Sequence, residues 1–287
     1  MSDLNDNALK PTPDLAEDNA FFPSPDSLAK FTSPQSDLSD ADYPNPYTGG
    51  RLKVLVIGSD ERYVPTDNGM LFSSGNHPIE TLLPMYHLER AGFGLDIATL
   101  SGNMVKFEHW AMPSEDEVVM GFYAKYLDQF RRPRRLSDVI EQALGEDSDY
   151  IGVFIPGGHA PLVRFPESQE VKAVLEWAAD NDKFIISLCH GPVALLALGE
   201  HHPQFTGYKI CAFPDALDEQ TPGMGYMPGK LTWKFGERLK AAGFEIINAG
   251  ISGAVHQDRK LLTGDSPFAA NPLGKLAAKA LLAHLGN

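Results

Sequence analysis

One segment of the sequence, Phe184-Ile-Ile-Ser-Leu-Cys-His-Gly-Pro192, places a cysteine directly after an apolar run that predicts a buried strand. Pro192 favours the start of a helix, so Cys189 lies in a sharp turn between the two elements. Such a turn strains the reactive residue and leaves room only for small neighbours two positions away, here Ser187 and Gly191. The pattern predicts a nucleophile elbow with Cys189 as the nucleophile.

The turn would place the sulfur at the N-terminus of a helix, whose partial positive charge favours a thiolate. We therefore expect Cys189 to be an accessible thiolate with a lowered pKa. The alternative is a cysteine that packs as a small hydrophobe, and the small neighbours and abrupt helix start argue against it. Cys211 lies in an apolar run with no such turn and is expected in the core. Two cysteines cannot form a disulfide framework.

A thiol nucleophile needs a base, and three histidines are candidates. His190 follows the cysteine directly, His77 lies in Gly75-Asn-His-Pro78, and His159 ends the segment Pro156-Gly-Gly-His159. Each of them could equally be a core or capping histidine. Spacing alone leaves the choice open.

Two further segments follow apolar runs and could reach the same site. Gly157 and Gly158 would let backbone amides approach a substrate oxygen, which predicts an oxyanion site, although paired glycines also occur in simple tight turns. Glu80 lies near a predicted helix start, where it could cap the helix or approach the sulfur. Beside the sulfur, burial and negative charge would keep it protonated and able to transfer protons.

The elements that must position these residues alternate along the chain. Short apolar runs predict strands at 54–57, 95–100, 151–155, 184–188, 209–212, 244–248 and 260–263. Spacings of three and four residues predict helices at 79–91, 169–179, 192–198, 232–242 and 272–285. The alternation predicts an α/β protein with a doubly wound, mostly parallel sheet, in which ligands bind at the carboxyl ends of the strands.

The predicted domain organisation has three parts. Residues 1–50 are rich in Pro, Ser, Asp and Asn and predict an extended arm, whereas residues 51–287 form the α/β domain. Residues 102–148 are too long for a simple crossover and predict a small inserted helical subdomain. Its cluster Arg131, Arg132, Arg134 and Arg135 suggests a solvated helix end rather than a phosphate site.

Charge and hydropathy exclude several classes of protein. A net charge of −14 argues against a general nucleic-acid binder, which needs an excess of Lys and Arg. No segment has the roughly 18 consecutive apolar residues of a membrane span. The acidic start, MSDLNDNALK, lacks the apolar core of an export signal, so we expect a cytoplasmic protein.

Several motifs together resemble the ThiJ/PfpI superfamily, and within it the bacterial branch of heat-shock chaperones, glyoxalases III and protein deglycases. The resemblance runs from about Tyr43 to the C-terminus. Its blocks include Gly75-Asn-His-Pro-Ile-Glu80, Pro156-Gly-Gly-His159, Ser187-Leu-Cys-His-Gly-Pro192 and Arg259-Lys-Leu-Leu-Thr-Gly-Asp265. The fold that it implies is flavodoxin-like.

The resemblance implies a role for each matching position. It makes Cys189 the nucleophile, His190 its partner, Asp218 the acid that orients His190, and Glu80 the acid beside the sulfur. From spacing alone Asp215 is an equal alternative to Asp218, and either could be a helix cap. The resemblance also implies a two-domain subunit, a homodimer and a holdase activity.

Relatives in this branch carry a metal site of two histidines and a glutamate. The matching positions here are Glu89, Gly94 and Tyr126, so two of the three ligands are lost and we expect no specific metal and no cofactor. The resemblance implies conversion of methylglyoxal or glyoxal to lactate or glycolate, and reversal of early glycation of proteins. The alternatives are a chaperone of unfolded proteins and a cysteine aminopeptidase or amidohydrolase.

Overall fold

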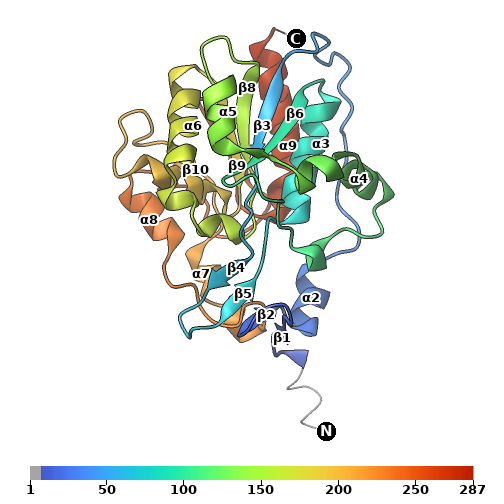
Figure 1. The fold of residues 1–287 in the computed structure, drawn as a ribbon, viewed down its shortest axis with the longest axis vertical. Coiled ribbons are helices and arrows are strands. Elements are labelled where there is room, and N and C mark those ends of the chain that lie inside the picture. Colours follow the sequence, from blue (N-terminus) through green and yellow to red (C-terminus); the bar gives the residue numbers. More distant parts are fainter. Residues whose placement is uncertain (1–7, 287) are drawn as a thin grey trace.

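A computed structural model describes residues 8–286 of the chain. Its centre is a seven-stranded sheet in the order β12-β13-β9-β8-β3-β6-β7 (Figure 1). Every neighbouring pair is parallel except β12 and β13. In that order the strands are Val255–Asp258, Leu261–Gly264, Phe184–Leu188, Tyr150–Ile155, Lys53–Ile57, Gly94–Thr99 and Arg134–Arg135. The predicted mostly parallel α/β sheet is confirmed.

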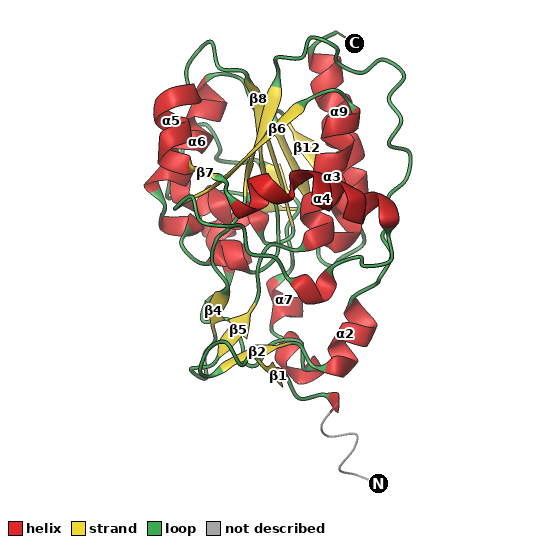
Figure 2. Ribbon diagram, turned by 45° about the vertical axis from the view of Figure 1, so that its right-hand side comes forward, coloured by secondary structure: helices red, strands yellow, loops and turns green. Residues whose placement is uncertain are grey.

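Helices cover both faces of this sheet, because successive strand residues point to opposite sides. In β3, Val54 and Val56 join one apolar core and Leu55 and Ile57 join the other. The first core is closed by α3 (Pro78–Arg90), α4 (Glu117–Arg131) and α9 (Ala270–His284). The second is closed by α5 (Leu136–Ala143), α6 (Gln169–Asp180), α8 (Phe235–Ala241) and the 3₁₀ helix η4 (Gly191–Leu198). Figure 2 shows α5 and α6 on one side and α3, α4 and α9 on the other.

Residues 102–148, expected as an inserted subdomain, are built into these layers. Phe122 and Phe130 of α4 lie in the first core, and Leu136 and Val139 of α5 lie in the second. Strand β7 extends the main sheet by pairing with β6. The structure therefore shows no separate core for this segment among the described residues.

A second, four-stranded sheet lies below the first in Figure 1 and joins the arm to the α/β layers. Its order is β1-β2-β5-β4, with bounds Thr12–Pro13, Ala20–Phe22, Leu71–Ser73 and Tyr63–Pro65. Helix α2 (Pro25–Phe31) follows β2, and the Ser24 amide donates to the Gly225 carbonyl over 2.8 Å. This hydrogen bond holds the start of α2 next to the segment that contains Tyr226.

The remaining elements are short. Strands β10 (Lys209–Ile210) and β11 (Glu245–Ile246) form their own parallel pair instead of joining the main sheet. The others are α7 (Asp215–Asp218), η1 (His109–Ala111), η2 (Ala160–Leu162), η3 (Phe165–Glu167), η5 (Thr221–Met224) and η6 (Pro267–Ala269).

Within residues 8–286, no helix combines the length and apolar character that crossing a membrane requires. The expectation that the chain starts without an export signal rests partly on residues 1–7, which lie outside the described residues.

Candidate active site

Cys189 lies in the sharp turn that the sequence predicted. Its φ is +58°, a left-handed conformation that a residue with a side chain seldom adopts. Ser187 Oγ donates to the Ile155 carbonyl over 2.9 Å, and a Cβ at Gly191 would collide with that hydroxyl and with the same carbonyl. The small residues on both sides are therefore required by close packing against the end of β8.

His190 is the histidine that the structure brings to the sulfur. Its Nδ1 lies 3.3 Å from Cys189 Sγ, and its Nε2 lies 2.8 Å from Asp218 Oδ2. Phe213 stacks on the ring with a centroid distance of 4.8 Å, and Phe235 packs on it at 5.0 Å. The ring is held in one orientation between the sulfur and the carboxylate.

The two aspartates that spacing could not separate have different partners. Asp215 accepts the backbone amides of Gly236 and Glu237, each over 2.9 Å, at the start of α8. It is a helix cap. Asp218 is buried and accepts from His190; burial acts to raise its pKa, but His190 and His159 hold it below the usual range.

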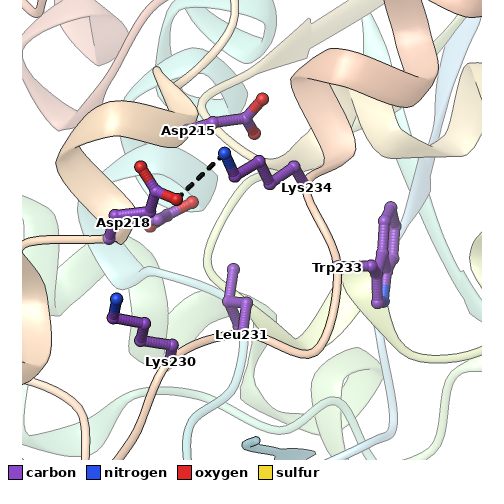
Figure 3. A pocket seen from close by; sticks show the side chains of 7 residues that line it. Asp215, Asp218, Lys230, Leu231, Trp233 and Lys234 are labelled. Carbon is purple, nitrogen blue, oxygen red and sulfur yellow. Dashed lines mark ion pairs between the residues drawn. The ribbon is translucent and has the colours of Figure 1, made fainter.

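A cavity of about 50 Å³ borders both aspartates. Figure 3 shows Lys230, Leu231, Trp233 and Lys234 around it. Lys234 Nζ forms an ion pair with Glu219 Oε1 over 2.9 Å. Cys189 is not among its lining residues. The cavity borders the back of the site rather than the sulfur.

Glu80 lies beside the sulfur. Its side chain, in the first turn of α3, is fully buried, and a Cβ at Gly157 would collide with its Oε2 and lie 2.8 Å from Cys189 Cβ. Burial raises the pKa of Glu80 to about 8, although interaction with Cys189 acts in the opposite direction. A carboxyl with this pKa is mostly protonated at neutral pH, as expected from the sequence for an acid beside the sulfur.

The expectation of an accessible thiolate is wrong. Cys189 is only 4% exposed, and burial together with Glu80 raises the pKa of its thiol well above the ordinary value. The His190 amide acts in the opposite direction but has a smaller effect. The sequence shows the helix start that favours a thiolate; it does not show the loss of water around the sulfur, which outweighs that helix start.

Gly157 lies against Glu80 and Cys189, and Gly158 lies against the backbone of residues 75–77. The φ of Gly158 is +91°, and a Cβ there would clash with the Gly75 carbonyl. The Gly157 carbonyl accepts the His77 amide over 3.1 Å, while the Gly158 amide faces the Glu80 carboxyl and lowers its pKa slightly. Both glycines thus allow the close approach of β8, α3 and the elbow.

The other two candidate histidines do not contact the sulfur. His77 is buried at the start of α3, its Nδ1 has no hydrogen-bond partner among the described residues, and burial lowers its pKa. His159 lies behind His190, with its ring centroid 4.1 Å from the His190 centroid. His159 Nε2 lies 3.3 Å from Asp218 Oδ1.

Glu108 is a site residue that the sequence reasoning missed. It is fully buried, its Oε1 accepts from Ser74 Oγ over 2.7 Å, and that oxygen lies 3.9 Å from His159 Nδ1. The available signal was a lone acid within the aromatic run Phe107-Glu-His-Trp110. That signal is weak, because an exposed glutamate between apolar residues is common.

The positions that match the relatives' metal site do not form one here. Tyr126 donates its hydroxyl to Glu89 Oε2 over 2.9 Å, and Lys125 forms an ion pair with the same oxygen. Gly94 offers no side chain, and the Lys53 side chain packs against it. An ammonium and a phenol therefore satisfy Glu89, and the residues do not fit a metal ion.

The atoms of His159, His190 and Asp218 lie within 4.8 Å of one another and could in principle ligate a cation. The same atoms are already joined by hydrogen bonds, since each Asp218 oxygen has one histidine Nε2. A proton network explains the cluster without a metal.

The fold and the buried cysteine elbow define a class of protein. The sequence pattern of the DJ-1/PfpI family matches residues 70–270, and the chain belongs to that family. The chain is 62% identical over 273 residues to the protein/nucleic acid deglycase HchA of Escherichia coli O7:K1 (strain IAI39 / ExPEC), which covers 95% of this chain and 96% of that protein. The HchA of Escherichia coli O157:H7 shows the same identity and coverage.

Solved structures share the fold at low sequence identity. Glyoxalase III of Candida albicans has a TM-score of 0.60 and 20% identity, over 80% of this chain and 98% of that chain. The Rapid Encystment Protein 24 KDa of Francisella tularensis has a TM-score of 0.66 and 19% identity, over 80% of this chain and 99% of that chain. The predicted superfamily and its flavodoxin-like fold are therefore confirmed.

Proposed function

We propose that this protein is a cysteine enzyme that converts methylglyoxal to lactate, and glyoxal to glycolate, without glutathione. Cys189 is the nucleophile, and His190 accepts the proton of its thiol. Asp218 orients the His190 ring, and Glu80 carries protons to and from the substrate. The same aldehyde chemistry extends to early glycation adducts, in line with the deglycase relatives.

The observation that carries the proposal is the neutral carboxyl of Glu80 against the sulfur. A group with a pKa of about 8 can both donate and accept a proton near neutral pH, which is what isomerisation of a carbonyl compound needs. Peptide cleavage by a thiol can take both of its proton transfers from the histidine alone. The site therefore favours dicarbonyl chemistry over an aminopeptidase or amidohydrolase.

The first step is addition of sulfur to the aldehyde. The Nε2 of His190 faces the Asp218 carboxylate and carries the ring proton, so Nδ1 accepts the proton of the thiol 3.3 Å away. The sulfur electron pair forms the S–C bond, and the carbonyl oxygen takes the proton of Glu80. The product is a hemithioacetal, with Glu80 now a carboxylate and His190 an imidazolium.

The second step moves hydrogen between the two carbons. Glu80 removes the proton from C1, the electron pair forms a C1–C2 double bond, and the ketone oxygen takes a proton from His190. Return of the Glu80 proton to C2, with loss of the C1 hydroxyl proton to His190, gives a thioester. One carbon is oxidised and its neighbour is reduced, so no external oxidant is needed.

Hydrolysis then restores the resting site. Water supplies hydroxide to the thioester carbon and its remaining proton to Glu80. The C–S bond breaks and the sulfur recovers its proton from His190. The net reaction is addition of one water to the dicarbonyl, and amides near Gly157 and Gly158 would stabilise the oxygen charge in both additions.

Three further expectations belong to this proposal. We propose a homodimer, a cytoplasmic location, and a holdase activity of the apolar surface. Scattered exposed apolar side chains support the last of these, and among the described residues the largest exposed fractions are Leu15 at 97% and Phe268 at 62%. Suppression of client aggregation that survives Cys189→Ser would separate the holdase role from the enzyme.

The decisive measurement is lactate formation from methylglyoxal in the absence of glutathione and added metal. The wild type should form lactate, and Cys189→Ser should lose the activity by at least about a thousandfold. The matched control is Cys211→Ser, which alters the other buried cysteine outside the relay and should keep most of the activity. Lactate formation by Cys189→Ser at the wild-type rate would refute the proposal.

A further inference from the structure

Two buried ionisable side chains that the proposed mechanism does not use, His159 and Glu108, lie next to Asp218 and His190. The two ring nitrogens of His159 face two different carboxylates: Nε2 lies 3.3 Å from Asp218 Oδ1, and Nδ1 lies 3.9 Å from Glu108 Oε1. His159, Glu108 and Asp218 are all buried, with exposed fractions of 5% or less. Ser74 donates to Glu108 Oε1 and fixes that carboxylate in place.

Proton counting distinguishes the states of this group. A neutral imidazole has one N–H and could present it to only one of the two carboxylates, whereas an imidazolium presents an N–H to each of them. Two buried carboxylates without a cation would be strongly destabilised. Burial acts to lower the pKa of His159, but Asp218 and Glu108 raise it to about 9.

The groups around His159 come from several elements. His190 precedes η4, and its ring is tilted by 36° from the His159 ring; His77 precedes α3, and Tyr226 follows η5 with its ring centroid 6.1 Å from that of His159. Burial lowers the pKa of His77 and raises that of Tyr226, so both are neutral near pH 7. Glu80 is also protonated there. His159 is therefore the cation nearest to His190 among the described side chains of this cluster.

We propose that His159 and Glu108 are positioning residues of the cysteine site: His159 holds a proton between Glu108 and Asp218, and thereby fixes Asp218 and keeps the adjacent His190 uncharged. This inference rests on the proposed function, in which a neutral His190 accepts the thiol proton. A cation whose ring centroid is 4.1 Å away opposes a second positive charge on His190. Burial lowers the pKa of His190, and His159 lowers it further against the effect of Asp218.

The pH profile of kcat/KM tests the inference with two variants. In His159→Gln the opposing charge is lost, so the acid limb that reports His190 should move to higher pH by about one unit. In Glu108→Gln, Asp218 still holds the proton on His159, while a negative charge that raises the pKa of His190 is lost, so the limb should move to lower pH by a smaller amount. The double variant should move the limb to higher pH, but by less than His159→Gln alone.

A matched control uses a histidine and glutamate pair away from the site. His202 Nε2 lies 3.4 Å from Glu176 Oε1, and His202→Gln should leave the pH profile unchanged. A folded His159→Gln whose acid limb stays at the wild-type pH, with only a lowered Tm, would show a merely structural role and overturn the inference.

Histidine NMR gives a readout that needs neither activity nor a stable variant. In ring-labelled wild type and in Cys189→Ser, the His159 ring should stay protonated to about pH 9, and His190 should lose its proton below pH 6.5. Titration of His159 near pH 6.5 would overturn the inference. These titrations stand even if the wild type forms no lactate, so failure of the proposed function is recognised separately.

Discussion

Glu80 and Glu108 are both fully buried in one site, yet their protonation differs. Glu80 lies against the Cys189 sulfur, no cation among residues 8–286 pairs with it, and burial raises its pKa to about 8. Burial is the largest single influence on Glu108 and acts in the same direction, but the interactions of Glu108 with His159 and Ser74 together outweigh it, and the pKa of Glu108 is lowered. The partner, and not the depth of burial, decides which carboxyl is neutral and which is charged.

The two protonation states give the two glutamates different roles in the site. A neutral carboxyl beside the sulfur is a mobile proton, ready to move to a substrate oxygen. Glu108 and Asp218 both have lowered pKa values and keep their negative charge near pH 7. These two carboxylates therefore act on His190 and His159 as constant charges. A site that must transfer one proton and retain another needs a neutral carboxyl and a charged carboxyl close together in space.

The largest expected effect comes from removing the mobile proton. Glu80→Gln keeps the shape of the side chain but cannot release a proton, so kcat for methylglyoxal should fall by about 10²- to 10⁴-fold. The check is lactate formation under steady-state conditions, with Glu89→Gln on the same helix as the control. A loss of less than about fivefold in Glu80→Gln would remove Glu80 from the mechanism.

The pH dependence of stability should show the same contrast. A folded-state pKa of about 8, above the ordinary 4.5, means that the native state binds the Glu80 proton more tightly than the unfolded state does. Its contribution is therefore full below about pH 4.5, falls as pH rises, and is lost by about pH 8, amounting to roughly 3 kcal/mol between pH 4.5 and pH 7. Urea unfolding from pH 5 to pH 8 measures this slope.

Two variants separate the carboxyls in that measurement. Glu80→Gln should flatten the decline, because an amide has no proton to lose. Glu108 has a lowered pKa, so its contribution is present above the ordinary pKa and disappears in acid; Glu108→Gln should leave the decline between pH 5 and pH 8 in place. Equal slopes in Glu80→Gln and wild type would contradict the assignment of the neutral carboxyl.

A smaller effect is expected from crowding the neutral carboxyl. Gly157→Ala would place a Cβ against Glu80 Oε2 and 2.7 Å from the Leu188 carbonyl, which should cost about 1–3 kcal/mol of unfolding free energy. Gly121→Ala is the control, because Gly121 is exposed in α4 with open space around its Cα, and alanine there should stabilise the helix slightly. If both variants have the same Tm, the close packing at Gly157 is not required.

The smallest effect is expected at Glu89, one of the positions that the resemblance matched to a metal site. Glu89 pairs with Lys125 at a partly exposed position, so Lys125→Met should change stability by less than about 1 kcal/mol. Treatment with a chelator should leave lactate formation unchanged. Activity that falls on chelation and returns with Zn²⁺ would show that a metal site persists.

Much of the fold was predictable because strong periodic signals specify it. Five of the seven predicted strands match strands of the main sheet, since buried parallel strands are continuous apolar runs. Strand β12, Val-His-Gln-Asp, was missed because it is a partly exposed edge strand held by its pairing with β13. The arm strands β1 and β2 were missed for another reason, because two or three residues are too few to show an alternating pattern.

The site divides in a similar way. The elbow, the paired glycines and Glu80 follow strands or begin a helix, so their meeting at one sheet edge could be predicted. Asp218 could not be chosen over Asp215 by spacing, because only the folded chain shows that Asp215 caps α8. Glu108 has only a weak local signal, and its partner His159 lies 51 residues away in sequence.

The order of residues along the chain thus determined the sheet, the strained cysteine turn and the chemical types that surround it, because these depend on local sterics and on the period of apolar residues. The tertiary structure determined the protonation states of the thiol and the carboxyl groups in the site. Whether a thiol or a carboxyl keeps its proton depends on how much water is removed and on which cation comes within reach. Both are set by segments that are distant in sequence and meet only in the folded molecule.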